Sequence, residues 1–375
     1  MMNAAPTPTT VSRVDGYRVL SGVNTSVRIL RICSVTVQTL GEYTLHKEIL
    51  KAKMSAWSNA LHGNEDYAER NGTLTTKEGK PTTAFGHYLS FAASMKWISV
   101  QGDAIRNSRL GFLLNHLIKE TPTTDVALSA AEKLFYLHQL FKNDGDTLIT
   151  LLALILDGAS SKADLQKRFE TAQAERRKQK QRLANDLSKL LIQDADREIR
   201  AQPKHLKDEK LRHKHLVPTR LAWLEDLGAL SPNRFELSQE GLRFFRSLPM
   251  LEGCALREIN QGWIEREATR VFCRLILPST PFQLWNSLAT ETKADLLLPL
   301  LKNADALFGN DGAMRLPLYA TLLYLSISLA AQHHIIAELA DLESTLENNF
   351  LLGGRAYSAR RAARENESYI TYNLR

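Results

Sequence analysis

Three polar residues have the types and order found in metal-dependent nucleases. Asp66 is followed by Glu78-Gly79-Lys80, and such enzymes hold Mg²⁺ between carboxylates while a lysine helps to activate water. This chemistry needs its ligands on a rigid element, whereas the stretch around Gly72 is rich in turn formers. A solvated loop or hairpin is therefore the expected structure, with a nuclease built on Asp66, Glu78 and Lys80 as an alternative.

No other motif completes a catalytic or cofactor site. The glycines of a P-loop enclose four residues and precede Lys-Ser/Thr, but six residues separate Gly72 from Gly79, and Pro81 follows the lysine. A cluster of histidines lies in a lysine-rich stretch without a neighbouring cysteine, which favours solvated or phosphate-facing rings over a zinc site. We therefore expect no metal, no cofactor and no catalysis by this chain. The clustered histidines are His205, His213 and His215.

Positive charge is concentrated in one stretch. The 375 residues carry a net charge of +7, while residues 161–220 alone hold 17 basic and 9 acidic residues, a net +8. Such a stretch attracts a polyanion, with a solvated helix as the alternative. The basic residues for which we predict DNA contacts are Arg176, Arg177, Lys178, Lys180, Arg182, Lys204, Lys207, Lys210, Arg212, Lys214 and Arg220.

A weak internal repeat relates two segments that lie 130 residues apart. Each copy has a turn dipeptide, then a serine, then a glycine three residues after the serine, and then an apolar-rich run. This order predicts a helix end, a strand, a tight turn, a second strand and a helix that begins at the serine. The shared positions are Gly102-Asp103 and Pro232-Asn233, Ser108 and Ser238, and Gly111 and Gly241.

The second copy resembles the winged helix-turn-helix family. The resemblance rests on LVPTRLAWLEDLGAL, from Leu216, and FELSQEGLRFF, from Phe235, and the first copy fits the pattern less well. It implies that the strand–turn–strand is a wing. The helix before the wing would then be a recognition helix, which reads base edges while basic residues hold phosphates.

In the first copy, helical spacing separates a core face from an outer face. The core face is expected to hold Phe85, Tyr88, Ala92 and Met95. The outer face of this helix and the wing after it then form the predicted DNA-binding surface. Its residues are Thr82, Thr83, His87, Ser90, Ser94, Arg106 and Arg109.

In the second copy, the core stripe is expected at Val217, Leu221 and Leu224. The outward positions would include Thr219, Trp223 and Asp226, and the Glu225-Asp226 pair would repel phosphate. Trp223 is typical of a protein interface, although it would also fit packing on a neighbouring helix. We therefore expect this copy to contact proteins or to act as framework, with Arg220 and Arg234 as its candidate phosphate ligands.

The expected architecture is mainly α with small β-wings. We expect a disordered lead over 1–20, a first winged-helix domain over 21–125, and a second over 126–249 that carries a long basic helical insertion at 161–215. A continuous helix from Lys162 to Arg200, without Pro or Gly, would measure roughly 60 Å. A helical C-terminal domain over 250–375 would end in a basic tail, as a surface helix or a segment that a partner orders.

The segment 316–337 has no charged residue, but its polar residues favour a buried core helix over a membrane span. The start of the chain lacks the features of a signal peptide, and three cysteines are too few for a disulfide framework. We therefore expect a cytoplasmic protein without a membrane segment. The cysteines are Cys33, Cys254 and Cys273.

These features favour a non-catalytic subunit that binds double-stranded DNA within a larger assembly. Tandem winged helices with long insertions resemble accessory subunits of bacterial genome-defence machines, including antiviral ones, or of mobile elements. A different hypothesis is an interaction scaffold that docks partner proteins through Trp223, the long helix and the C-terminal domain. Two further hypotheses are a transcription regulator and a nuclease built on Asp66, Glu78 and Lys80.

Overall fold

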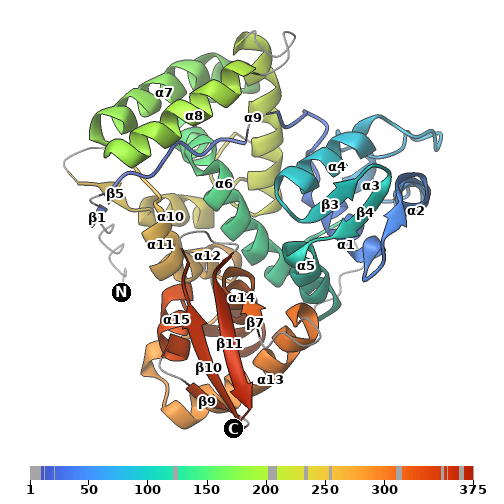
Figure 1. Cartoon of the computed structure of the whole chain (residues 1–375). Helices are drawn as coiled ribbons and strands as arrows, with labels where there is room; N and C mark the ends of the chain where they lie inside the picture. Colours follow the sequence, from blue (N-terminus) through green and yellow to red (C-terminus); the bar gives the residue numbers. More distant parts are fainter. Residues whose placement is uncertain are drawn as a thin grey trace.

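A computed structural model gives the arrangement of the chain (Figure 1). Helices dominate and the strands form small sheets, which confirms the expected mainly α class. Helix α6 (Ala130–Leu156) lies at the centre and packs against helices from every other part of the molecule. The structure describes residues 10–11, 13–20, 22–120, 126–201, 209–231, 235–252, 256–309, 315–347, 350–352, 354–362 and 367–374.

The first region, residues 22–120, contains a helical core and a small three-stranded sheet. The sheet has the order β2-β4-β3, with both pairs antiparallel, and Gly102 turns between β3 and β4 at a φ of 59°. Phe85, Tyr88, Ala92 and Met95 are buried as the helical spacing predicted. Its elements are α1 (Leu30–Leu40), β2 (Leu45–His46), α2 (Lys47–Ala60), α3 (Glu65–Ala68), α4 (Ala84–Ser94), β3 (Ile98–Gln101), β4 (Ala104–Asn107) and α5 (Arg109–Glu120).

The long helix expected from Lys162 to Arg200 is wrong, because two helices replace it. Helix α7 (Lys162–Leu183) ends where Ala184 turns to an extended ψ of 139°, and α8 (Asp186–Ala201) begins after Asn185, whose side chain accepts the Ser188 N–H. The two helices lie beside each other rather than in one rod (Figure 1). Helix α9 (Glu209–Asp226) then returns along α6 and α7.

The expected disordered lead over 1–20 is also wrong for the residues that the structure describes in it. β1 (Thr10–Val11) pairs in parallel with β5 (Met250–Leu251). Val14 and Tyr17 are buried, and Tyr17 packs with Ala184 and Ile192 at the junction of α7 and α8. Residues 13–20 therefore help to bury the apolar side chains where α7 meets α8.

The internal repeat is visible as a shared local geometry. In each copy the serine hydroxyl and its backbone N–H donate to consecutive carbonyls at the preceding helix end, and the serine oxygen accepts the N–H of the repeat glycine. The helix-end residues have left-handed backbones, with φ 57° at Lys96 and 76° at Gly228. The second hairpin is smaller, with one bridge between Leu230 and Leu237, and its predicted turn at 232–234 lies outside the described residues.

The C-terminal region is less helical than expected, because its end forms strands. The predicted basic tail, expected as a surface helix or a segment ordered by a partner, is instead largely two antiparallel strands of a sheet with the order β7-β11-β10-β9. The second copy ends with α10 (Gln239–Ser247). The helices of the C-terminal region are α11 (Gln261–Arg266), α12 (Ala268–Ile276), the 3-10 helix η2 (Trp285–Ser287), α13 (Thr290–Phe308), α14 (Leu318–His333) and α15 (Leu339–Glu347). The strands are β6 (Gln283–Leu284), β7 (Arg315–Pro317), β8 (Ile335–Ile336), β9 (Phe350–Leu352), β10 (Arg355–Arg360) and β11 (Tyr369–Leu374).

Helix α14 is the buried core helix that the uncharged stretch predicted. Almost all of its side chains are buried, and it packs against α5, α6, α13 and α15. None of the helices in the described part of the chain has the length and apolarity to cross a membrane. A single apolar cluster extends from Val23 to Tyr372, so the three expected domains share one core.

Candidate nucleic-acid interface

The outer face of α4 is polar and uncharged. Thr83, Ser90 and Ser94 are exposed, and His87 is half-buried. The hydroxyls of Ser90 and Ser94 donate only to carbonyls of their own helix, whereas Thr82 donates to the Thr73 carbonyl and so belongs to the loop. The predicted recognition face is therefore present as a surface, without a carboxylate that would repel phosphate.

The two arginines predicted for the wing separate in the structure. Arg106 lies on β4, opposite Ser99, and is exposed on the outer face of the sheet. Arg109 is the first residue of α5 rather than part of the wing, and its exposed side chain faces a cleft behind α4. Only Arg106 therefore occupies the expected wing position.

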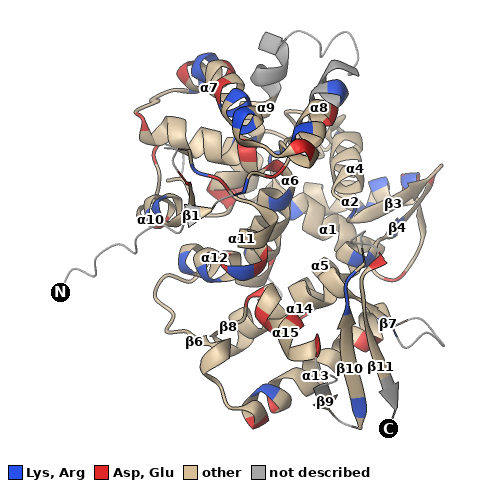
Figure 2. Cartoon of the chain, turned by 60° about the vertical axis from the view of Figure 1, so that its left-hand side comes forward, with Lys and Arg blue, Asp and Glu red and all other residues tan. Residues whose placement is uncertain are grey.

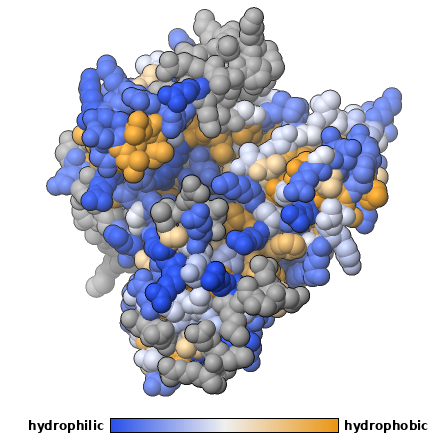
Figure 3. Space-filling model, in the orientation of Figure 1, coloured by the Kyte–Doolittle hydropathy of each residue, from blue (hydrophilic) through white to orange (hydrophobic). Residues whose placement is uncertain are grey.

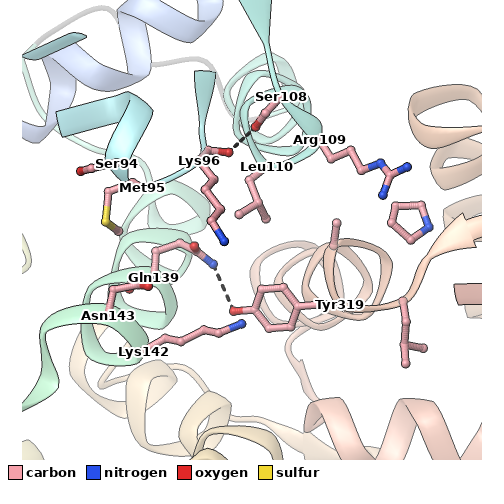
Figure 4. A pocket seen from close by; sticks show the side chains of 13 residues that line it. Ser94, Met95, Lys96, Ser108, Arg109, Leu110, Gln139, Lys142, Asn143 and Tyr319 are labelled. Atoms are coloured by element: carbon pink, nitrogen blue, oxygen red, sulfur yellow. Dashed lines mark hydrogen bonds between the residues drawn. The ribbon is translucent and has the colours of Figure 1, made fainter. Parts of the chain in front are cut away.

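That cleft lies where the first region meets α6 and α14. It encloses about 800 Å³, and Lys96, Arg109 and Lys142 contribute its positive charge (Figure 4). The Lys142 amine lies 3.4 Å from the centre of the Tyr319 ring, and the Tyr319 hydroxyl accepts a hydrogen bond of 3.1 Å from the Gln139 amide. The residues that line the cleft include no Asp or Glu.

Three of the residues predicted to bind DNA are buried in ion pairs within the chain: Arg176, Lys180 and Arg220. Lys180 lies 3.0 Å from Asp146 and 2.9 Å from Glu258, and Arg176 bridges the same two carboxylates. Burial alone would raise the pKa of Asp146, but the charges of Lys180 and Arg176 hold it well below its ordinary value. Helix α7 has no apolar residue at this point because its buried face carries Arg176 and Lys180. The carboxylates of Asp146, on α6, and Glu258 neutralise these two charges.

The second copy is buried on the sides that the sequence placed outward. Arg220 is fully buried and pairs with Asp144 at 2.7 Å. Trp223 is also buried: its indole N–H donates to the Val27 carbonyl and its ring stacks on Phe91 of α4. Both side chains are enclosed within the chain, because α9 packs between α7 and the first region.

The prediction that Asp226 repels phosphate at the surface is wrong. Asp226 is buried, accepts the Leu30 N–H at the start of α1, and pairs with Arg70 at 2.6 Å. Burial raises the pKa of this carboxyl, against the opposing charge of Arg70. Asp226 therefore joins the end of α9 to the first region.

The other basic residues predicted to contact DNA divide into those that α7 presents and those that the structure does not describe. Lys178 and Arg182 are exposed on α7, and Arg177 is half-buried beside the Tyr17 ring. Helix α7 and the β3–β4 hairpin lie at opposite sides of the molecule (Figure 2). Lys204, Lys207 and Arg234 lie outside the described residues, as do the side chains of Lys210, Arg212 and Lys214.

The nuclease set is not assembled as a metal site. Asp66 lies on the single turn α3, while Glu78 and Lys80 lie in a hairpin that turns at Gly79 with a φ of 78°. All three side chains are exposed. Across the described residues, no group of three or more His, Cys, Asp or Glu side chains has the geometry to hold a metal ion.

The corner between α7 and α8 exposes a stripe of leucines. An apolar patch is visible at this corner in the space-filling view (Figure 3). Exposed fractions range from 48% for Leu183 to 69% for Leu187, and Leu190 and Leu191 complete the stripe. Clustered exposed leucines of this kind mark interaction surfaces more often than isolated ones.

Comparison with known proteins identifies no relative: no family model, no curated protein and no solved structure matches this chain.

Proposed function

We propose that this chain is a non-catalytic subunit that binds double-stranded DNA through a winged-helix module formed by residues 26–107. The observation that carries the proposal is the order of α1, β2, α2, α4, β3 and β4 together with the sheet order β2-β4-β3. In a winged helix, the third helix lies in the major groove and the hairpin contacts the flanking backbone. Helix α4 is followed directly by the β3–β4 hairpin, and this order supports assigning these two roles to them.

One feature separates this module from a minimal winged helix. Residues 61–83 connect α2 to α4 and include α3 and the short hairpin around Gly79, where a helix-turn-helix has a short turn. The connection ends at Thr82 and Thr83, next to the start of α4. We propose that it extends the contact surface beside the recognition helix.

The electrostatic part of the binding belongs to the first region. Arg106 on the wing and Lys47 at the start of α2 are exposed, and the Lys47 N–H donates to the Asp103 carbonyl at the wing tip. A residue that contacts a phosphate weakens binding to all sequences alike and lowers the salt slope by about one when it is removed. Arg106→Ala should therefore weaken duplex binding about tenfold at low salt.

The test is fluorescence anisotropy of a labelled short duplex, titrated with protein at several salt concentrations. Arg106→Ala and Ser90→Glu are the test variants, since Ser90→Glu places a carboxylate on the uncharged face of α4. Lys178→Ala with Arg182→Ala is the matched control, because it removes two exposed cations from the opposite side of the molecule. Equal losses in the control and test variants would overturn the assignment to the first region.

The scaffold function is a second candidate, favoured by the leucine stripe on α7 and α8. Its flanks carry both signs of charge, with Lys189 near Asp186 and Arg197 near Asp194, so two copies of the chain can meet there without net repulsion. Sedimentation of the wild type and of Leu187→Glu tests this pairing. A dimer that becomes monomeric in Leu187→Glu supports it, and a wild-type monomer at high concentration contradicts it.

A further inference from the structure

The cleft between the first region, α6 and α14 has the features of an anion site. Lys142 lies against the Tyr319 ring, Lys96 extends into the cavity above it, and the Arg109 side chain lines the cavity farther along, directed away from the two lysines (Figure 4). No hydrogen bond or ion pair of the described residues engages the side-chain nitrogens of Lys96 or Arg109. Like charges that line one cavity without a carboxylate repel one another, and an anion bound in the cavity relieves that repulsion.

The backbone at Lys96 supports a role for its side chain. Lys96 has a left-handed conformation, with φ 57°, at the position that Gly228 occupies in the second copy with φ 76°. A non-glycine residue is strained in this conformation, whereas glycine adopts it freely. Strained residues of this kind concentrate at functional sites. The first copy therefore retains a strained lysine at the edge of the cleft, where the second copy has the residue best suited to the backbone.

We propose that this cleft binds phosphate groups. Its volume of about 800 Å³ is within the range of small-molecule sites. Lysine and arginine are the side chains that bind phosphate, as a point charge and as a fork of donors respectively. The Gln139 amide, which also donates to Tyr319, and the Asn143 side chain add polar groups to the wall.

Two sources can supply the phosphate: a free nucleotide, or the backbone of the DNA that the first region is proposed to bind. The second source rests on the proposed function and the first does not. In either case the ligand contacts Lys96, which follows the end of α4, and Arg109, which follows the end of β4. Both residues lie at the end of the β3–β4 hairpin opposite its turn. The same pair of residues therefore tests both sources.

The test uses the full chain and three probes: pyrophosphate, ATP and a short duplex. The variants are Lys96→Gly and Arg109→Gln, alone and together, with Lys178→Gln plus Arg182→Gln as the matched control, because these two exposed cations of α7 lie outside the cleft. Lys96→Gly removes the charge and the backbone strain at once, so it is expected to fold at least as well as the wild type. Thermal melting of each variant confirms that a loss of binding is not a loss of fold.

We expect the wild type to bind ATP and pyrophosphate in calorimetry, and the double variant of Lys96 and Arg109 to bind them at least tenfold more weakly, while the control variant of Lys178 and Arg182 binds them as the wild type does. If only the duplex loses that factor in the double variant, the phosphate comes from the DNA backbone. If no probe binds the double variant more weakly than the control, the proposal is overturned. A wild type that binds ATP but no duplex overturns the proposed function and leaves the cleft intact.

Discussion

The two copies of the internal repeat share a backbone design and differ in what surrounds it. In both, a serine and a glycine fasten the last helix to the end of the preceding one. In the first copy, α4 presents Ser90 and Ser94 to solvent. In the second, α9 buries Trp223 and Arg220 against the first region and α6. A local pattern thus specifies how the helix end and the next helix are joined, while the surrounding elements decide whether the outer face of the first helix is exposed, as in α4, or buried, as in α9.

The basic residues show the same division. Those of the first region, such as Lys96, Arg106 and Arg109, are exposed. Arg176, Lys180 and Arg220, which belong to the stretch with the highest net charge, are buried with carboxylates. Net charge along the sequence therefore overstates the positive charge that this stretch presents to solvent, because Arg176, Lys180 and Arg220 are paired inside the fold.

The largest effect is expected from the buried network that holds α7. Lys180→Met leaves Asp146 and Glu258 with Arg176 as their only remaining buried cation among the described residues. Removing one partner of a buried ion pair costs about 3–5 kcal/mol of the free energy of unfolding. Chemical denaturation measures this loss, with Lys178→Met as the control, since Lys178 is an exposed lysine of the same helix and its change should stay within about 0.5 kcal/mol.

Equal, small effects of Lys180→Met and Lys178→Met would break the comparison, because the packing of α7 would then not depend on its buried charges. A large loss of stability with unchanged duplex binding at low temperature would sharpen it. That result would show that the cations of 161–220 that are buried serve the fold alone.

The sequence predicted the parts of the fold that depend on local spacing. The core positions of α4, the serine–glycine pattern of the repeat and the buried uncharged helix α14 each follow from residues close together in the chain. The network around Lys180 does not, because Asp146 and Glu258 come from distant segments and nothing in ERRKQKQR distinguishes Arg176 and Lys180 from their solvated neighbours. The spacing of these two, one helical turn apart, was the only local signal of a shared face.

The cleft escaped prediction for a related reason. Lys96, Lys142 and Tyr319 come from three regions, and no periodicity connects them. One signal was available: the repeat places Lys96 just after the end of α4 and Gly228 just after the end of α9. The 130-residue offset hid this pairing, because the second hairpin is shorter and the register of the repeat changes across it.

The next effect in size concerns the repeat glycines. A Cβ at Gly111 would lie 2.0 Å from the Trp97 carbonyl oxygen, and one at Gly241 would lie 1.9 Å from that of Ala229. Gly111→Ala and Gly241→Ala should each lower the free energy of unfolding by about 1–3 kcal/mol, because backbone must move. Gly86→Ala is the control: its Cβ meets nothing on the exposed face of α4, so the helix should gain slightly.

A similar loss in both repeat variants supports one shared backbone design. If Gly241→Ala is tolerated while Gly111→Ala is not, the second copy does not need the close contact between residue 241 and the Ala229 carbonyl. The two copies would then not share one backbone design. Denaturant titrations of the three variants, with unchanged slopes, decide between these outcomes.

The smallest effect is expected at the two helix ends, and it tests why the copies differ there. Lys96→Gly should raise the free energy of unfolding by about 1 kcal/mol, since glycine removes the penalty of the left-handed backbone. Gly228→Ala should lower it by a similar amount, because a Cβ there meets no other atom and only the backbone conformation opposes it. Thermal and chemical unfolding of both variants measure these changes.

The sign of the change in the free energy of unfolding decides why the two copies differ at these positions. If Lys96→Gly is stabilising, the first copy holds a lysine at a cost to its own fold, which is the expected pattern for a residue retained for a ligand. If Lys96→Gly is destabilising, the lysine side chain contributes to packing or to local electrostatics, and the contrast with Gly228 has a structural cause. In that case the strain at Lys96 no longer supports an anion site, and only the calorimetric experiment on the cleft can do so.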